Sequence, residues 1–294
     1  MSVLLSVVLR LVFWVGVLCF IAGIALIGPR RLYELGHEVV PILRDAKVPI
    51  AGLLVVLIVS AVGRSALETL SRLVGIPLTG TIYALEGGFV AWLQATFVTP
   101  EATIYFSWIY VYGYVFLLVF PFIAYAALPK TTTFKRLIVA YTLNYAIGLL
   151  IYTIIFAHGP RNVMPDAVTS LLYTFNPDFQ ALTSEVNENT NVFPSLHTSL
   201  AVTAGVFGYL TRREYPIWAG LSIWLAVSVM ISTMYLGIHW LVDVIAGIGL
   251  AFGCVYLSYR FIEDEEPADG SDEQPEEATA DPGGGHPAVG DGGD

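Results

Sequence analysis

Long apolar stretches separated by short polar segments set the pattern of this chain. They lie at about residues 3–27, 48–63, 104–127, 136–157, 196–211, 216–234 and 239–260. Each approaches or reaches the roughly 20 residues that an α-helix needs to cross a bilayer. The pattern therefore predicts an all-α fold, a polytopic membrane helical bundle of about seven transmembrane helices.

The segment 76–98 has a mixed pattern. It carries Glu86 and a Gly87-Gly88 pair. Aromatic residues also occur along it, at Tyr83, Trp92 and Phe97. Such a segment either spans the membrane or lies along the interface as an amphipathic helix with aromatic anchors.

Basic residues in the loops favour the interfacial alternative. They cluster at 28–47, 128–136 and 212–214. Short basic loops tend to stay in the cytoplasm, and these three share one side only if 76–98 does not cross. We therefore expect an integral protein of the cell (plasma) membrane, with its N-terminus outside and its C-terminal tail in the cytoplasm.

Charge is concentrated at the C-terminus. The chain has a net charge of −10, although only 13% of its 294 residues are charged. From Phe261 onward there are 12 acidic residues and no Lys or Arg. Such a segment buries too little apolar surface to order itself, so 261–294 is expected to be a disordered acidic tail. The rest of the chain has no basic face large enough for nucleic acid.

Two short segments, from Asn191 to His197 and from Tyr235 to Asp243, each place a histidine next to a long apolar run. A lone histidine in an apolar protein is usually a satisfied core residue. An ionisable side chain inside a membrane segment costs about 2.5–3.5 kcal/mol, however, so its presence suggests a function.

His239 and Asp243 are four residues apart, and on a helix this spacing puts two side chains on one face, about 5–6 Å apart. A carboxylate there accepts from one imidazole nitrogen and leaves the other free to attack. His197 is a second proton carrier if the fold brings it opposite. Two histidines and a carboxylate suffice for phosphoryl transfer through a phosphohistidine.

The expected topology places these groups at one membrane level, on the extracytoplasmic side. The helix ends there carry His158, Arg161, His197, His239 and Asp243. The outer loop from His158 to Pro194 lies above them and can close over a site. Its acidic residues are Asp166, Asp178, Glu185 and Glu188. Pro194 suits a first helical turn, whose exposed amides beside Ser195 would face a bound phosphate.

The two strings resemble known signatures. They are Phe193-Pro194-Ser195-Leu196-His197 and the run from Ser232-Thr233-Met234-Tyr235-Leu236 through His239 to Asp243. They are similar to the second and third signatures of the type-2 phosphatidic acid phosphatase superfamily. The resemblance covers about residues 104–260 and is closest to the branch containing inositol phosphorylceramide synthases.

By this resemblance, His239 is the nucleophile, Asp243 its orienting partner and His197 the acid that protonates the leaving group. The resemblance also implies a six-helix membrane core, a lipid substrate and no metal or other cofactor. Nothing in the sequence indicates the oligomeric state. The expected division is N-terminal transmembrane helices at 1–75, a catalytic membrane core at 76–260 and the tail at 261–294.

Two basic residues that bind phosphate in the phosphatase signatures are absent from this sequence. Ile154 stands where the lysine is expected, seven residues before Arg161, and Thr233 stands where an arginine is expected. Arg161 is the best remaining phosphate-binding candidate and His158 the second, with Ser195 at the helix start. A phosphodiester carries one negative charge and needs fewer cations, which favours headgroup transfer between lipids.

Other functions remain open. A lipid phosphate or isoprenoid diphosphate phosphatase would have the same fold, with water as the acceptor. A non-enzymatic, proton-coupled membrane transporter would place its ionisable groups near mid-membrane and often shows repeated halves. A catalytically inactive scaffold is the third alternative, and the presence of all three catalytic positions argues against it.

Overall fold

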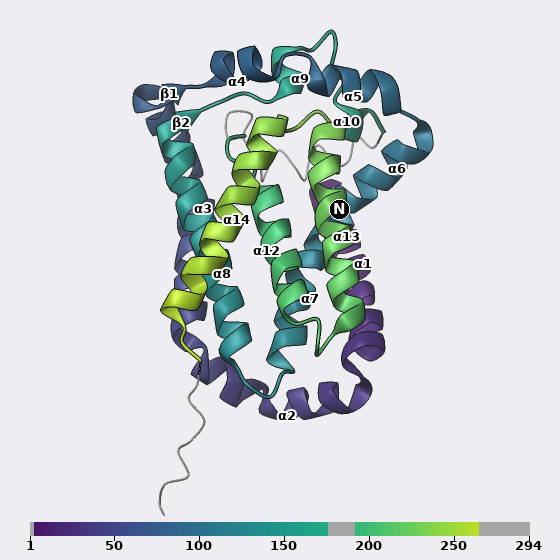
Figure 1. Cartoon of the computed structure of the whole chain (residues 1–294), viewed down its shortest axis with the longest axis vertical. Coiled ribbons are helices and arrows are strands. Elements are labelled where there is room, and N and C mark those ends of the chain that lie inside the picture. Colours follow the sequence, from purple (N-terminus) through teal and green to yellow (C-terminus); the bar gives the residue numbers. More distant parts are fainter. Residues whose placement is uncertain (1–2, 176–191, 265–294) are drawn as a thin grey trace, which may run out of the picture. The chain divides into compact units, whose positions relative to one another are not determined.

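The computed structural model describes residues 3–175 and 192–264 (Figure 1). The chain up to Glu263 forms one compact unit. Three acidic residues of the outer loop, Asp178, Glu185 and Glu188, lie outside the described residues. So does nearly all of the acidic tail, from residue 265 onward.

The described residues are almost entirely helical. The long elements are α1 (Val3–Ala22) with η1 (Gly23–Ile27), α2 (Pro29–Asp45), α3 (Lys47–Val74), α6 (Pro100–Trp108) with η2 (Ile109–Gly113) and α7 (Tyr114–Ala126), α8 (Thr132–Ile154), α12 (Leu196–Leu210), α13 (Pro216–Tyr235) and α14 (Leu241–Phe261). The short elements are β1 (Ile76–Pro77), α4 (Thr79–Glu86), α5 (Phe89–Phe97), β2 (Ile155–Phe156), α9 (Pro160–Val163) and α10 (Leu171–Phe175). The strands pair in parallel, Ile76 with Ile155 and Pro77 with Phe156. The expected all-α fold is confirmed.

Five helical segments of the described chain are long and apolar enough to cross a membrane. They are Leu4–Ile27, Pro100–Ala126, Thr132–Ile154, Pro216–Tyr235 and Leu241–Phe261. α2 and α3 provide a sixth if they count as one broken span, bent by 75°. α12 has 15 residues, fewer than the roughly 20 that span a bilayer. All seven predicted stretches are thus helical, but that of α12 is short.

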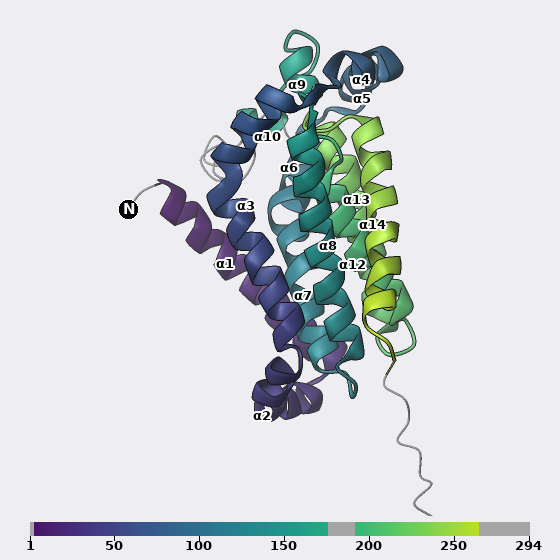
Figure 2. The same cartoon turned by 90° about the vertical axis from the view of Figure 1, so that its left-hand side faces the viewer.

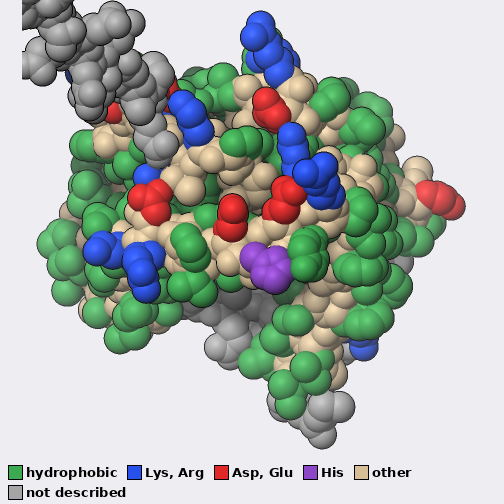
Figure 3. All heavy atoms as spheres, turned by 90° about the horizontal axis from the view of Figure 1, so that it is seen from below, with side chains coloured by type: hydrophobic (Ala, Val, Ile, Leu, Met, Phe, Trp, Pro, Cys, Tyr) green, Lys and Arg blue, Asp and Glu red, His purple; other side chains and the backbone are tan. Residues whose placement is uncertain are grey.

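The three basic loops meet at one end of the bundle. α2 crosses this end before the chain turns into α3 (Figure 2). Asp45 of α2 pairs with Lys135 Nζ at 2.7 Å, and Arg31 lies 3.8 Å from Glu214. Figure 3 shows Lys, Arg, Asp and Glu side chains spread over this end. The loops therefore share one side, as the topology requires. Which side of the membrane that is stays a prediction.

The segment 76–98 does not form a spanning helix. It folds into α4 and α5, which have 8 and 9 residues and lie across the opposite end of the bundle (Figure 1). Gly87 separates them with a φ of +62°, a value that favours glycine. This arrangement corresponds to the interfacial alternative.

α12 runs through the middle of the bundle and packs against α7, α8, α13 and α14. Gly205 makes one close approach possible, because a Cβ there would lie 3.2 Å from the Ala226 Cβ of α13. On the α8 side, Asn144 donates to Thr203 Oγ1 at 3.1 Å and accepts from Ser199. Small residues and buried polar contacts of this kind hold membrane helices together, so α12 is fixed on both sides.

Candidate active site

His239 lies in the turn that joins α13 to α14, two residues before α14 begins. Its Nδ1 is 3.4 Å from Asp243 Oδ2, and both side chains are buried. The two residues are close, as expected, but not because they share a helical face. Instead, Gly237 turns the chain with a φ of +74°, and a Cβ there would lie 2.8 Å from Val168 Cγ1.

Asp243 is the third residue of α14 and folds back over its first turn. Its Oδ2 accepts from the Trp240 N–H at 2.8 Å, as in a capping box. Asp243 Oδ1 and His239 Nδ1 have no hydrogen-bond partner among the described residues. Catalytic hydrogen bonds often tighten only when substrate binds. The 3.4 Å separation is therefore suited to closing into an Asp–His hydrogen bond.

His197 lies in the first turn of α12 and faces His239, with 5.8 Å between the ring centroids. The rings of Tyr110 and Tyr114 each lie 4.9 Å from the His197 ring. Tyr110 belongs to the π-helical turn Ile109–Gly113, a feature frequent at functional sites. The structure thus brings the three expected catalytic side chains together and packs two tyrosines on one of them.

Arg161 lies in α9, beside the turn that carries His239. Its backbone N–H donates to the Gly237 carbonyl at 3.2 Å. The guanidinium lies over the Tyr173 ring at 4.9 Å, and its Nη2 is 3.4 Å from the Tyr173 hydroxyl. Its Nη1 is buried and has no hydrogen-bond partner in the part of the chain that the structure describes. That donor is available to an anion.

Ser195 and His158 make contacts with protein groups. Ser195 Oγ caps α12 by accepting from the Thr198 N–H at 3.2 Å. The His158 carbonyl accepts from Trp240 Nε1 at 2.8 Å, and its imidazole meets the Phe156 ring edge-on at 4.9 Å. Both residues therefore border the site, and their part in phosphate binding stays a prediction.

A protein-family model described as the PAP2 superfamily matches residues 83–257, more than half of the chain. The chain belongs to the PAP2 superfamily. No curated protein and no solved structure gives a match. The match confirms the resemblance at the level of the superfamily and includes every candidate site residue. It supports phosphatase or phosphotransferase chemistry over the transporter alternative.

The two departures from the PAP2 phosphatase signatures have clear structural positions. Ile154 is the last residue of α8 and is exposed. Thr233 is buried, and its hydroxyl donates to the Met230 carbonyl at 2.8 Å. Neither side chain can supply the positive charge that a lysine or arginine would bring.

The charge state of His239 suits a nucleophile. Burial lowers its pKa to about 3, and the positive charge of Arg161 acts in the same direction. A hydrogen bond with the Val192 backbone opposes this shift. The imidazole is therefore neutral at pH 7 and keeps the lone pair that an attack on phosphorus requires.

Sequence reasoning missed several residues of this PAP2 site. Tyr110 and Tyr114 had one local signal, the spacing of four that brings both onto His197. Glu86 and Gln94 had no local signal, because their partners lie far away in the sequence. Gln94 Nε2 donates to the Tyr235 carbonyl at 2.9 Å and to the Thr169 carbonyl at 3.0 Å. Gln94 thus ties α5 to the end of α13 and to the loop that follows Arg161.

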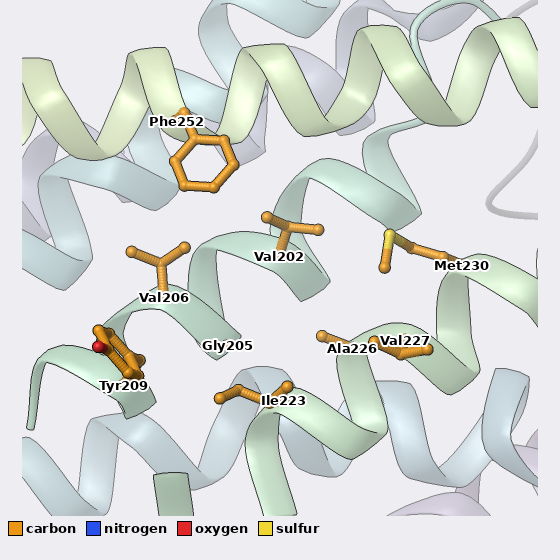
Figure 4. Close-up of a pocket in the computed structure, with 9 residues that line it drawn as sticks. All are labelled: Val202, Gly205, Val206, Tyr209, Ile223, Ala226, Val227, Met230 and Phe252. Carbon is orange, nitrogen blue, oxygen red and sulfur yellow. The ribbon is translucent and has the colours of Figure 1, made fainter. Parts of the chain in front are cut away.

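An apolar groove of about 320 Å³ lies between α12, α13 and α14 (Figure 4). Its lining includes Val202, Val206 and Tyr209 of α12, Ile223, Val227 and Met230 of α13, and Phe252 of α14. Val202 is five residues after His197, which is about 7.5 Å along a helix. Five residues also turn the helix by about 140°, so the groove lies on a different face of α12 from His197.

Proposed function

We propose that this protein transfers a phospho-headgroup from a lipid phosphodiester to the hydroxyl of a second lipid, as an inositol phosphorylceramide synthase does. The observation that carries the proposal is the grouping of half-buried His197 with buried His239 and Asp243 in one site. The histidine rings are 5.8 Å apart, and the His239–Asp243 distance is 3.4 Å. A phosphohistidine route requires these three groups.

In the first half of the reaction, Nε2 of His239 exchanges its contact with the Val192 backbone for the substrate and attacks phosphorus. The bond between phosphorus and the oxygen of the first lipid breaks, and His197, protonated in the complex with the anionic phosphodiester, gives its proton to that oxygen. Asp243 accepts from Nδ1–H and stabilises the positive charge that develops on the imidazole. The headgroup phosphate is then bonded to His239.

In the second half, neutral His197 takes the proton of the acceptor hydroxyl. The acceptor oxygen bonds to phosphorus, and the bond between phosphorus and His239 breaks. His239 returns to its neutral form and His197 to its protonated form, so one cycle consumes no proton. With water as the acceptor, the same steps make a phosphatase.

The scarcity of cations in the motif positions favours a phosphodiester donor. A phosphomonoester carries up to two negative charges, and several Lys or Arg side chains suit it. Here Ile154 and Thr233 occupy two of the expected cationic positions, and Arg161 supplies one buried donor without a partner among the described residues. One such donor matches a phosphodiester, which carries one negative charge.

The groove supports a lipid substrate. It is lined mainly by apolar side chains, several of them exposed on the helix surfaces, and one wall of it is α12, the helix that carries His197. Such a groove suits a hydrocarbon chain. In this proposal the site opens on the extracytoplasmic side of the plasma membrane, and the C-terminal tail is cytoplasmic.

The test is a product ratio. Purified protein in detergent is supplied with a phosphodiester lipid labelled in its headgroup, with and without a lipid alcohol, and the products are identified by mass. We expect label in a new lipid only when the alcohol is present. His239→Ala should give no product and no covalent phosphoenzyme.

Two outcomes contradict the proposal in different ways. Label that appears only as free phosphate or free headgroup phosphate, whatever alcohol is present, identifies a phosphohydrolase with the same site. Near-normal turnover in His239→Ala rules out the phosphohistidine route altogether.

A further inference from the structure

Glu86, the last residue of α4, reaches the start of the helix that carries Asp243. Its Oε2 accepts from the Val242 N–H at 3.1 Å, across 156 residues of sequence. Burial raises the pKa of this carboxylate, and the adjacent amides of Leu241 and Val242 act against that rise. Leu241 and Val242 are the first two residues of α14, and the first amides of a helix have no intrahelical acceptor. Glu86 therefore caps α14 from outside.

The first turn of α14 is consequently held by two carboxylates. Asp243, the next residue along, closes the turn from within by accepting from Trp240 N–H at 2.8 Å. The same Asp243 Oδ2 is the atom that lies 3.4 Å from His239. Any shift of this turn moves the atom that orients the nucleophile.

The rest of segment 76–98 contacts the same connections. Thr79 Oγ1 accepts from the His158 N–H at 3.0 Å. The Tyr83 ring lies 6.1 Å from the Trp240 ring, edge-on. Both contacts come from α4, the helix that ends at Glu86, and they limit how far the Glu86 carboxylate can move away from α14.

We propose that Glu86 is a positioning residue for His239: it fixes the first turn of α14, hence Asp243, and through Asp243 the imidazole. This inference rests on the proposed role of His239 as nucleophile. Glu86 acts as a hydrogen-bond acceptor for the Val242 amide, and it acts on the substrate through Asp243 and His239.

The acceptor role predicts a difference between two substitutions. Glu86→Gln keeps a side-chain oxygen at the same reach, so it should retain turnover within a few-fold. Glu86→Ala removes the acceptor and releases the turn. A misplacement of about 1 Å can cost on the order of 100-fold, so we expect a loss of that size in kcat with little change in KM.

The leaving-group dependence separates this role from acid catalysis. Glu86→Ala misplaces the nucleophile, so the loss should be equal for good and poor leaving groups. Loss of the acid at His197 should spare good leaving groups, which need no proton. Glu101→Ala is the matched control, because Glu101 is an exposed acid in the first turn of another helix, α6. It should leave kcat unchanged.

Hydrogen exchange tests the inference without any substrate. The amides of Leu241 and Val242 should exchange faster in Glu86→Ala than in wild type, and at the wild-type rate in Glu86→Gln and Glu101→Ala. Wild-type turnover in Glu86→Ala would overturn the inference, as would a Gln variant as inactive as the Ala variant. If the wild-type protein transfers no phosphoryl group, the proposed function fails. In that case, unchanged exchange in Glu86→Ala overturns the inference as well, and faster exchange supports the cap.

Discussion

Substitution of Gly159 tests how closely α9, which carries Arg161, must approach the turn that carries His239. Gly159 is the N-cap residue directly before α9, and it lies against the Ile238 carbonyl in the turn before His239. A Cβ at Gly159 would lie 2.4 Å from that oxygen, whereas ordinary contact begins at 3.4 Å. Gly159→Ala must therefore push the two segments apart by about 1 Å. The clash is with backbone on one side, so no flexible side chain can absorb it.

The displacement separates the phosphate-binding candidate from the nucleophile. The Arg161 N–H donates to the Gly237 carbonyl at 3.2 Å, and this contact joins the same two segments. A shift of about 1 Å in a reacting geometry can cost on the order of 100-fold in rate. We therefore expect kcat/KM to fall about 100-fold, which corresponds to about 2.7 kcal/mol of transition-state stabilisation.

The assay compares kcat/KM on the labelled phosphodiester lipid for wild type, Gly159→Ala and Gly80→Ala. Gly80 lies in the first turn of α4 at the same end of the bundle, and a Cβ there meets nothing within 4 Å. Gly80→Ala should behave as wild type. If Gly159→Ala folds and retains the kcat/KM of Gly80→Ala, activity does not require the close approach of α9 to the His239 turn. That result would refute the prediction.

Three further predictions address the acid, the buried nucleophile and the topology. His197→Ala should slow poor leaving groups by roughly 10²–10⁴-fold and spare good ones, which a leaving-group series measures. The folded pKa of His239, about 3, lies below the ordinary value of 6.5, so the unfolded chain binds the extra proton as pH falls from 6.5 toward 3. Protonation of this group in the unfolded chain should lower the free energy of unfolding by at most about 1.4 kcal/mol per pH unit over that range. The Tm of His239→Gln, measured between pH 7 and pH 4, should therefore depend less on pH than the Tm of the wild type. A reporter fused after Asp294 should be cytoplasmic, and a cysteine at Asp178 should react with an impermeant reagent from outside; the opposite pattern would invert the topology.

Hydropathy and short sequence motifs predicted the helices and the contact between His239 and Asp243, because both features depend on residues that are close together in the sequence. Apolar runs near 20 residues become helices wherever they occur, so the helices were evident. The short spacing between His239 and Asp243 was enough to bring the two together. The turn that does so had a signal in Gly237, since glycine is the usual residue where a helix ends in a left-handed conformation.

The contacts between distant segments were not predictable in the same way. Glu86 lies in a segment whose pattern fits two placements, and its hydrogen bond to Val242 spans 156 residues. No periodicity encodes such a pairing, because it depends on how α4 and α14 meet after the bundle has formed. The tyrosines on His197 also belong to a separate helix, and only the packing of η2 and α7 against α12 turns their spacing into a contact.

The shortness of α12 has a consequence for where catalysis occurs in the bilayer. Its 15 residues extend about 22 Å, whereas the hydrocarbon core is about 30 Å thick. In Figure 1 its start lies below the upper ends of α13 and α14. The start of α12 is therefore recessed from that end of the bundle. If α13 and α14 span the bilayer, a lipid reaches α12 only by sinking toward the hydrocarbon or by local thinning of the membrane, and both adjustments cost energy that rises with bilayer thickness. We therefore expect turnover to depend on the thickness of the surrounding bilayer.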